Sequence, residues 1–410
     1  RSTHCISSAA SDVYKRQRST GISELCRLRR SEGYGGCDDE MAKRVYIGVG
    51  GKARKVKKIY IGVAGVARKV KKAYIGVGGV ARPCWSGGEL SYYGTAATLT
   101  NSIAYHAGTS VGNYALFGGG YYHPSAATYS TVNAYSNALT RSTPTALSTA
   151  RYYLAAASVG NYALFGGGRP DSSAVDAYST SLTRSVPTAL SQARRQLNGA
   201  SVGNYALFGG GLYSNSGYSN DVDAYNASLT RSLPSALGEA RYNLAAASVG
   251  NYALFAGGAA YDDGAYSSSY LDAYNASLTK TSKSLGMITS RGSSASVGSY
   301  ALFAYAPGAK VQSVNTSLTT ADIADLSRGR RNPAGGSVGD YALFAGGYES
   351  GYLGTVDVYD ASLTKTVTTD LSKARESAES ARAGDFLLFG GGMISTGNSA
   401  ATNIVDAYTI

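Results

Sequence analysis

Few residues in this 410-residue sequence could carry out acid–base or metal chemistry. The long repeated region, which begins near residue 103, holds two histidines, His106 and His123, and neither stands in a His-x-His or His-Glu pattern. The last of the four cysteines is Cys84, so the repeats contain no thiolate, and the sequence has no CxxC pair. Asp262 and Asp263 are adjacent acids in a glycine-flanked loop, where carboxylates usually face solvent. The sequence therefore predicts a protein that is not an enzyme and has no metal site and no cofactor.

Basic residues are concentrated in one short segment. Residues 41–82 hold twelve Lys and Arg and no acid, whereas residues 83–410 hold nineteen bases and twenty acids. The segment could bind polyanions such as nucleic acid or teichoic-acid phosphates by counterion release, or it could be the solvated face of an assembly element. The assembly role is favoured, because the tyrosines stand before the glycines rather than among the lysines. The basic residues in question are Lys52, Arg54, Lys55, Lys57, Lys58, Arg68, Lys69, Lys71 and Lys72.

An arginine recurs once per long repeat. It stands at positions 151, 194, 241, 330 and 375, and Arg291 is displaced by one residue. One interpretation is structural: each arginine ties down a loop carbonyl or pairs with an aspartate of the "VDAY" phrase. The other interpretation is a ring of ligand-binding cations. The structural one is favoured, because a residue that follows the period usually serves the repeat itself. The candidate aspartates are Asp176, Asp223, Asp272, Asp357 and Asp406.

Ligand recognition has better candidates, in the loops whose length varies. The interval between each glycine cluster and the next "DAY" phrase ranges from 5 to 13 residues and is rich in Tyr, Ser, Gly, Asn and Asp. This composition is typical of adaptable binding loops, although a tyrosine-rich chain could also place these residues in its solvated loops. We expect a recognition face for carbohydrate or protein. Its candidate residues are Tyr121, Tyr122, Arg169, Tyr213, Tyr218, Tyr261, Asp262, Tyr266, Tyr348 and Tyr352.

Seven copies of one phrase define the elements that must position these loops. "SVGNYALFGGG" begins at Ser110, Ser158 and Ser201, and four weaker copies follow, so the period is near 45 residues. The pattern predicts four strands, a to d, in each unit. For example, strand a spans 242–248 and strand b spans 252–255, with a tight Gly-Asn turn between them, and strand c contains the "VDAY" phrase. Strand d is illustrated by residues 229–237 of the preceding unit. The prolines of strand d, such as Pro234, place it at the rim, because proline cannot donate a ladder hydrogen bond.

The residue types agree with an all-β, seven-bladed propeller of four-stranded blades. The alanines and serines of strand a suit innermost strands that converge on a central channel. The phenylalanine of each "YALF" is expected to fill the space between neighbouring sheets. The chain ends after strand c of the seventh unit, so the stretch at 90–100 is expected to supply the missing rim strand. The loops between b and c and the connections from d to a should then emerge on one face.

This pattern resembles kelch repeats: a strand that ends in a Gly-Gly doublet, a variable loop, a strand with Tyr, and a rim strand. The resemblance covers about residues 103–410 and implies a propeller fold. The chain departs from the family six residues beyond the tyrosine, where kelch units usually carry Trp and this chain mostly has Arg or Lys. It also lacks the copper ligands of galactose-oxidase-like kelch proteins and the Ser-x-Asp-x-Gly-x-Thr-Trp boxes of sialidase-like propellers.

Two segments precede the predicted propeller, which we assign to residues 88–410. Residues 1–40 have no periodicity and read as a leader that is disordered or not native. Residues 41–87 contain three fourteen-residue units, such as "VYIGVGGKARKVKK", which predict an arm of β-hairpins that docks on a partner or forms a homo-oligomer. These units resemble segments in prophage structural proteins of Gram-positive bacteria.

Two functions follow from these resemblances. The first is a non-catalytic adhesion module, tail-associated in a phage or prophage, which holds virion proteins through the arm and a host-surface glycan or protein through the propeller. The second is an intracellular kelch-type scaffold for protein partners. The first places the protein on a virion or cell surface and the second in the cytoplasm. Neither a signal peptide nor an apolar stretch of bilayer length is evident, and nucleic acid is the less favoured partner.

Overall fold

The computed structural model describes the backbone of residues 46–49, 52–55, 60–63, 66–69, 73–77, 80–85, 89–213, 217–260, 268–289, 292–395 and 400–410. Side chains are described from residue 89 onward within these ranges, except at 286–289. The predicted leader, residues 1–40, lies outside the described part. The chain divides into two compact units, Arg1–Glu89 and Leu90–Ile410.

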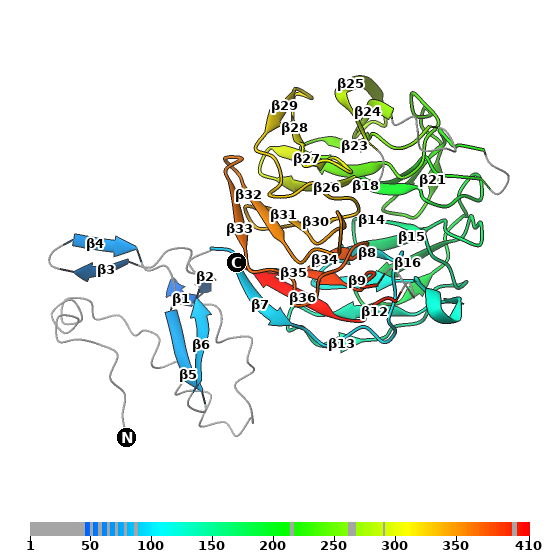
Figure 1. Ribbon diagram of the computed structural model, residues 1–410. Coiled ribbons are helices and arrows are strands. Elements are labelled where there is room, and N and C mark those ends of the chain that lie inside the picture. Colours follow the sequence, from blue (N-terminus) through cyan, green and yellow to red (C-terminus); the bar gives the residue numbers. More distant parts are fainter. Residues whose placement is uncertain are drawn as a thin grey trace. The chain divides into compact units, whose positions relative to one another are not determined.

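The first unit contains three two-stranded antiparallel hairpins (Figure 1). In each hairpin the Tyr-Ile-Gly-Val run pairs with the run that follows it, as the fourteen-residue repeat predicts. Lys52, Arg54 and Lys55 lie on β2, whereas Lys57, Lys58, Lys71 and Lys72 fall outside the described residues. Arg68 and Lys69 lie on β4. The strands are β1 (Tyr46–Val49), β2 (Lys52–Lys55), β3 (Tyr60–Val63), β4 (Val66–Lys69), β5 (Ala73–Val77) and β6 (Val80–Trp85).

The second unit is a ring of seven four-stranded antiparallel sheets, the predicted propeller (Figure 1). Its innermost strands contact one another in the circular order β8, β14, β18, β22, β26, β30, β34 and back to β8. These strands a are β8 (Ala107–Val111), β14 (Ala155–Val159), β18 (Asn198–Val202), β22 (Ala245–Val249), β26 (Ser293–Val297), β30 (Ala334–Val338) and β34 (Glu379–Ala383). Strands b are β9 (Tyr114–Gly118), β15 (Tyr162–Gly166), β19 (Tyr205–Gly209), β23 (Tyr252–Ala256), β27 (Tyr300–Ala304), β31 (Tyr341–Ala345) and β35 (Phe386–Gly390).

Strands c and d complete each blade toward the rim. Strands c are β12 (Val132–Tyr135), β16 (Val175–Ser179), β20 (Val222–Asn226), β24 (Ser268–Asn275), β28 (Val311–Asn315), β32 (Val356–Asp360) and β36 (Val405–Thr409). Strands d are β13 (Arg141–Ser142), β17 (Arg184–Ser185), β21 (Arg231–Ser232), β25 (Lys280–Thr289), β29 (Thr320–Ile323), β33 (Lys365–Thr368) and β7 (Ser91–Thr95). We number the blades 1 to 7 from β8 onward.

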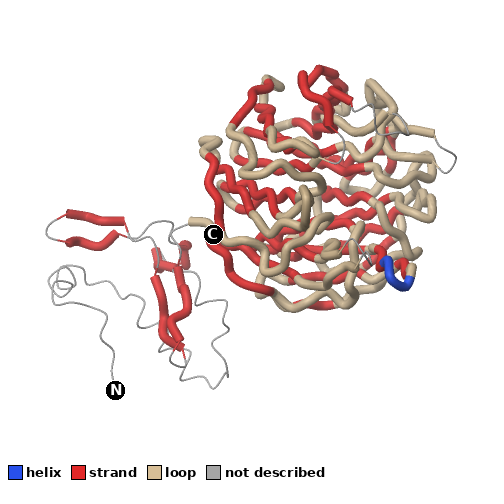
Figure 2. The backbone as a smooth tube through the Cα atoms, viewed as in Figure 1, coloured by secondary structure: helices blue, strands red, loops and turns tan. Residues whose placement is uncertain are grey.

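Helix is nearly absent from the described residues. The loop between β9 and β12 contains the short strands β10 (Tyr121–Tyr122) and β11 (Ala127–Thr128), joined by one 3₁₀ turn at His123–Ser125, which is blue in Figure 2. Within the part of the chain that is described, no helix has the length and hydrophobicity needed to cross a bilayer.

Closure of the ring follows the prediction. The first strand of the unit, β7, pairs with the last, β36, so blade 7 combines three C-terminal strands with one N-terminal strand. The Tyr92 hydroxyl strengthens this seam by donating a hydrogen bond of 2.7 Å to Asp406. Blade 7 therefore has four strands like the other blades, and the outer edge of β36 is covered.

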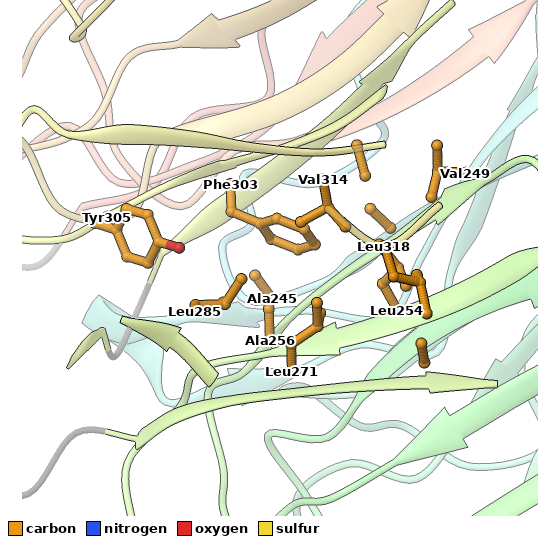
Figure 3. Packing of buried hydrophobic residues seen from close by; sticks show 13 residues of the cluster. Ala245, Val249, Leu254, Ala256, Leu271, Leu285, Phe303, Tyr305, Val314 and Leu318 are labelled. Carbon is orange, nitrogen blue, oxygen red and sulfur yellow. The ribbon is translucent and has the colours of Figure 1, made fainter. Parts of the chain in front are cut away.

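Aromatic side chains fill the space between blades, also as predicted. The phenylalanine at the fourth position of each strand b is at most 1% exposed, and the tyrosines of strand c in the six blades that have one are fully buried. Figure 3 shows one such layer, where Phe303 and Val314 of blade 5 meet Leu254 and Leu271 of blade 4. The phenylalanines are Phe117, Phe165, Phe208, Phe255, Phe303, Phe344 and Phe389.

Strand d is shorter than the sequence analysis predicted. Residues 229–237 were expected to form one strand, but only Arg231 and Ser232 pair with strand c. Blades 1 to 3 carry Pro144, Pro187 and Pro234 two residues after their paired dipeptide, and there the rim strand has two residues. Proline has no N–H to donate and ends the ladder. Blades 4 to 6 have no proline at this position, and their rim strands have four residues or more.

Candidate functional site

The variable loops and the d-to-a connections share one face of the propeller, as predicted. In six blades, the residue three positions before strand a forms a β-bridge with the residue that follows strand b by three positions, as Tyr152 does with Arg169 and Arg331 does with Tyr348. Each pairing fixes a loop residue beside a connection residue. We call this side of the ring the loop face.

A circle of residues with left-handed backbone surrounds the channel on the loop face. Their φ values lie between +49° and +58°, and their backbones are linked from blade to blade. Tyr153 N–H donates to the Tyr105 carbonyl at 2.8 Å, Gln196 N–H to Tyr153 at 2.9 Å, and Asn243 N–H to Gln196 at 3.0 Å. Within the described residues, this belt brings one side chain from each of six blades to the mouth of the channel. Its described members are Tyr105, Tyr153, Gln196, Asn243, Asn332 and Ser377.

The belt encloses a cavity of about 370 Å³ that all seven blades line. This volume is at the lower end of the range of small-molecule sites, roughly 300 to 1,000 Å³. Its wall combines the amides of Gln196, Asn198 and Asn243 with the rings of Tyr105 and Tyr153. A second cavity of about 330 Å³ continues between the innermost strands and is lined mostly by Ala, Gly and Ser. The first cavity therefore has the side chains that could orient a ligand.

Tyrosines from blades 1 and 2 gather on one side of this mouth. The Tyr105 and Tyr153 rings are 4.5 Å apart between centroids, and Tyr121 stacks on Tyr152 at 4.6 Å. Tyr152 and Tyr153 are themselves 5.1 Å apart, so the four rings are continuous. The Arg169 guanidinium lies 5.9 Å from the centre of the Tyr152 ring. Predicted residues Tyr121 and Arg169 thus belong to one aromatic cluster.

The cluster extends through blade 7 to blade 6. Tyr105 and Tyr122 of blade 1 and Tyr352 of blade 6 pack against one buried cluster, which combines Ala104 of blade 1 with Met393 and Ala401 of blade 7. Tyr352 lies 5.2 Å from Tyr348, whose ring carries the Arg331 guanidinium at 4.4 Å. All seven tyrosines are neither fully buried nor fully exposed. We call this surface the tyrosine arc; it consists of Tyr105, Tyr121, Tyr122, Tyr152, Tyr153, Tyr348 and Tyr352.

Other predicted ligand residues do not join the arc. Tyr213 donates its hydroxyl to Asp221 at 2.6 Å within its own loop. Burial first, and this hydrogen bond second, raise the pKa of Tyr213. Tyr218 stacks on Tyr242, 5.7 Å away, at the border of blades 3 and 4. Tyr261, Asp262 and Tyr266 lie outside the described residues.

Sequence reasoning missed three members of the arc, Tyr105, Tyr152 and Tyr153. The prediction assigned their stretch to strand a, but strand a begins two residues beyond the left-handed position. A signal was present in the internal alignment. The pair of residues after the recurring arginine is different in each unit (Tyr-Tyr, Arg-Gln, Tyr-Asn, Arg-Asn and Glu-Ser), whereas the arginine itself repeats. Such variation inside a conserved-length connection indicates positions that the fold leaves free.

The recurring arginines are structural, and the alternative of a ring of ligand-binding cations is wrong. Arg151, Arg194, Arg241, Arg330 and Arg375 are at most 1% exposed. Each lies 2.6 to 2.7 Å from the predicted aspartate of its own blade. Each also donates to the carbonyl of its blade's strand b phenylalanine, at 3.0 to 3.2 Å. Burial lowers the pKa of Arg151 and Arg330, and the adjacent carboxylates oppose that shift. Arg291 is not among the described residues.

Two titratable side chains besides the tyrosines line the cavity among the described residues, His106 and Glu379. His106 is buried, and burial lowers the pKa of its imidazole to about 3. Within the described ranges, no three His, Cys, Asp or Glu side chains are grouped so that they could hold a metal ion. The arrangement that the described residues do provide is an aromatic and amide-lined concavity, which suits binding of a polar ligand with apolar faces.

Comparison with known proteins supports the fold. No protein-family model matches the sequence, and no curated protein is similar to it. Among solved structures, one titled "Structure of YjhT" superposes with a TM-score of 0.53 at 14% identity, over 64% of this chain and 96% of that chain. At this identity the likeness concerns the fold alone. By its architecture, the chain is a seven-bladed β-propeller.

Proposed function

We propose that this protein is a non-catalytic binding module that recognises a saccharide through the tyrosine arc and the cavity beside it. The observation that carries the proposal is a set of seven partly exposed tyrosines from blades 6, 1 and 2, grouped around the buried cluster of Ala104, Met393 and Ala401 beside a polar concavity. Ring contacts hold four of them together in blades 1 and 2 and pair Tyr348 with Tyr352 in blade 6, so these side chains lose little freedom on binding. A sugar ring presents C–H groups on one face and hydroxyls at its edge. The arc offers aromatic faces to the first, and the amides of Gln196 and Asn243 offer donors and acceptors to the second.

The shape of the site favours a saccharide over a protein ligand. A specific protein interface usually buries about 800 Å² on each partner over a fairly continuous surface. Here the aromatic groups surround a cavity of about 370 Å³ at the centre of the ring. A folded protein surface would leave most of this cavity unfilled. A kelch-like scaffold for protein partners is the second candidate function, because such a scaffold would bind its partner through the same loop face.

A glycan array probed with the full chain tests the proposal. We expect selective binding to a small set of glycans and at least a tenfold loss when Tyr152→Ala removes the ring that contacts both Tyr121 and Tyr153. Tyr270→Ala is the matched control, because Tyr270 is 42% exposed on strand c of blade 4 and belongs to no part of the arc. An array without selective binding, together with a defined protein partner, would establish the scaffold role instead. Recovery of the bound glycan unchanged after prolonged incubation would support a non-catalytic role.

The basic hairpins are proposed as the attachment segment of a tail-associated or surface adhesin. Their support is the resemblance of the fourteen-residue units to prophage structural proteins and the paired strands of β1 to β6. Deletion of residues 41–87 should leave glycan binding unchanged and abolish co-purification with virion proteins. If the deletion leaves co-purification intact, the attachment role is wrong.

A further inference from the structure

The cavity at the channel mouth has one acidic side chain among the described residues that line it, Glu379. Glu379 is the first residue of β34 in blade 7. The innermost strands of the other blades begin with Ala107, Ala155, Asn198, Ala245, Ser293 and Ala334. The repeat therefore uses a small or neutral residue here in six blades of seven. A carboxylate at this position serves something other than the repeat.

The half-buried Glu379 carboxylate also lacks the arginine partner that the buried strand c aspartates of five blades possess. Asp176, Asp223 and their equivalents each lie 2.6 to 2.7 Å from an arginine. No ion pair joins Glu379 to any described residue. Burial raises the pKa of Glu379 to about 8, and no neighbouring charge contributes to that shift. Glu379 lines the cavity and is only half-buried, but a carboxylate that is partly removed from water and has no counter-ion favours either a bound proton or a bound cation.

The surroundings of Glu379 favour an organic ammonium over a metal ion. Calcium requires about six to eight oxygen ligands, several of them carboxylates, and the described residues contain no cluster of three acidic or metal-binding side chains. Tyr105 and Tyr153 line the same cavity, with ring centroids 4.5 Å apart. The faces of tyrosine rings attract ammonium groups. A carboxylate beside aromatic rings is the chemistry that recognises a protonated amine.

We propose that this cavity binds the protonated amine of an amino sugar, with Glu379 as its counter-ion and Tyr105 and Tyr153 as its aromatic wall. The proposal rests on the proposed saccharide function and names the class of sugar, a hexosamine whose nitrogen is not acetylated. An N-acetylated sugar has a neutral amide in place of the ammonium and leaves Glu379 unpaired. Glu379 therefore distinguishes the free amino sugar from its N-acetylated form.

Calorimetric titration of the full chain tests this selectivity. The probes are a trimer of glucosamine, the same trimer fully N-acetylated, and cellotriose as the neutral analogue. At pH 7.5 we expect the glucosamine trimer to bind at least tenfold more tightly than the other two. Glu379→Gln keeps the shape and removes the charge, so it should bring the ratio close to one without weakening the neutral trimers. Glu349→Gln is the control, because Glu349 is exposed on the same face and pairs with Arg328.

A second measurement covers the case in which no sugar binds. Butylamine keeps its charge below about pH 10, and only the ionised carboxylate attracts it. Because the pKa of Glu379 is raised to about 8, the affinity of butylamine should rise about tenfold from pH 6 to pH 7 and about fivefold from pH 7 to pH 8, and this rise should disappear in Glu379→Gln. The other titratable groups lining the cavity within the described residues are His106, Tyr105 and Tyr153. His106 stays neutral over this range, because burial lowers its pKa to about 3.

The possible results separate the two proposals. If the wild-type chain binds the three trimers equally well, the amine pocket is wrong and saccharide recognition stands. If butylamine binds with the expected slope but no trimer binds, the pocket stands and saccharide recognition is wrong. If neither butylamine nor any trimer binds, both are wrong. Thermal unfolding of Glu379→Gln at the parental temperature would confirm that its loss of selectivity is not a loss of folding.

Discussion

The buried arginine and the buried aspartate of a blade occur together in this propeller. Where the buried arginine is present, the aspartate is present too, as in Arg194 and Asp223 at 2.7 Å. In blade 1 both charges are absent: Ile103 stands at the arginine position and Asn133 at the aspartate position, both buried. Asn133 accepts hydrogen bonds from the backbone and hydroxyl of Thr100 at 3.0 and 2.8 Å. Blade 1 thus shows that an isoleucine and an asparagine can occupy the two positions of the ion pair.

This pairing predicts the effect of breaking it. Arg194→Ile alone leaves Asp223 buried with only the more distant Arg231, at 3.7 Å, as a cation. We expect a loss of about 3 kcal/mol in the free energy of unfolding, because an unpaired buried charge is costly. The double variant Arg194→Ile with Asp223→Asn copies blade 1 and should recover most of that loss. Urea unfolding measures both, and a double variant no more stable than the single one would contradict the explanation.

The buried histidine gives a prediction about pH. Burial lowers the pKa of His106 from 6.5 to about 3, so the folded protein keeps this ring neutral while the unfolded chain protonates it below pH 6.5. Stability should therefore fall as the pH drops below 6.5, by about 1.4 kcal/mol per unit. The equivalent residues of the next three blades are Leu154, Leu197 and Leu244. His106→Leu should reduce the slope of unfolding free energy between pH 6.5 and pH 5, and an unchanged slope would contradict this assignment.

Elements are held together across blades by a serine that recurs in six of the seven repeat phrases. The Ser201 hydroxyl donates to the Ser158 carbonyl at 2.6 Å and accepts from the Ser158 N–H at 3.3 Å. Ser248 does the same to Ser201. The side chain thus replaces the backbone ladder that two innermost strands of neighbouring blades cannot form. This explains why the phrase keeps Ser where strand a needs only a small residue.

We call each of these pairs of serine hydrogen bonds a serine clamp, and removing one clamp should weaken the contact between two blades. Ser201→Ala deletes both hydrogen bonds between blades 2 and 3 and leaves the Ser158 backbone facing the channel. We expect a loss of about 1 to 2 kcal/mol in the free energy of unfolding. Ser185→Ala, on the exposed rim of blade 2, should change it by less than about 0.5 kcal/mol. Equal effects of the two variants in thermal or urea unfolding would show that the clamp contributes nothing.

Most of the strands and their order in a blade could be predicted from the sequence, because each repeat of about 45 residues forms one blade. The phrase "YALF" alternates side chains between two neighbouring blades, and all seven phenylalanines are buried as expected. The length of strand d could not be predicted from the pattern alone, since it depends on where Pro234 and its equivalents stop the ladder. The tyrosine arc could be predicted only in part. Tyr121, Tyr122, Tyr348 and Tyr352 stood in variable loops, but their meeting across blade 7 depends on the packing around Met393.

The whole molecule depends on one seam. Strand β7 closes blade 7 against β36, and it is separated from that strand by the entire length of the propeller. A ring without this strand exposes the edge of β36 and loses the Tyr92–Asp406 hydrogen bond. Closure should therefore control stability and solubility together.

Two truncations differing only in β7 test this. A chain that begins at residue 89 keeps β7 and should unfold in one transition at the parental temperature. A chain that begins at residue 97 lacks it and should melt well below that temperature and aggregate during size-exclusion chromatography. Identical melting of the two chains would mean that the seam does not hold the ring.

The serine clamps and the phenylalanine layers are built from phrases that repeat nearly letter for letter, whereas the belt positions and the b–c loops on the loop face vary from blade to blade. DNA that encodes such units is prone to unequal exchange between one copy and another. An exchange within the shared phrases would move a complete b–c loop into a neighbouring blade in correct register. Lineages of this protein could thus acquire a new ligand without passing through an unfolded intermediate form.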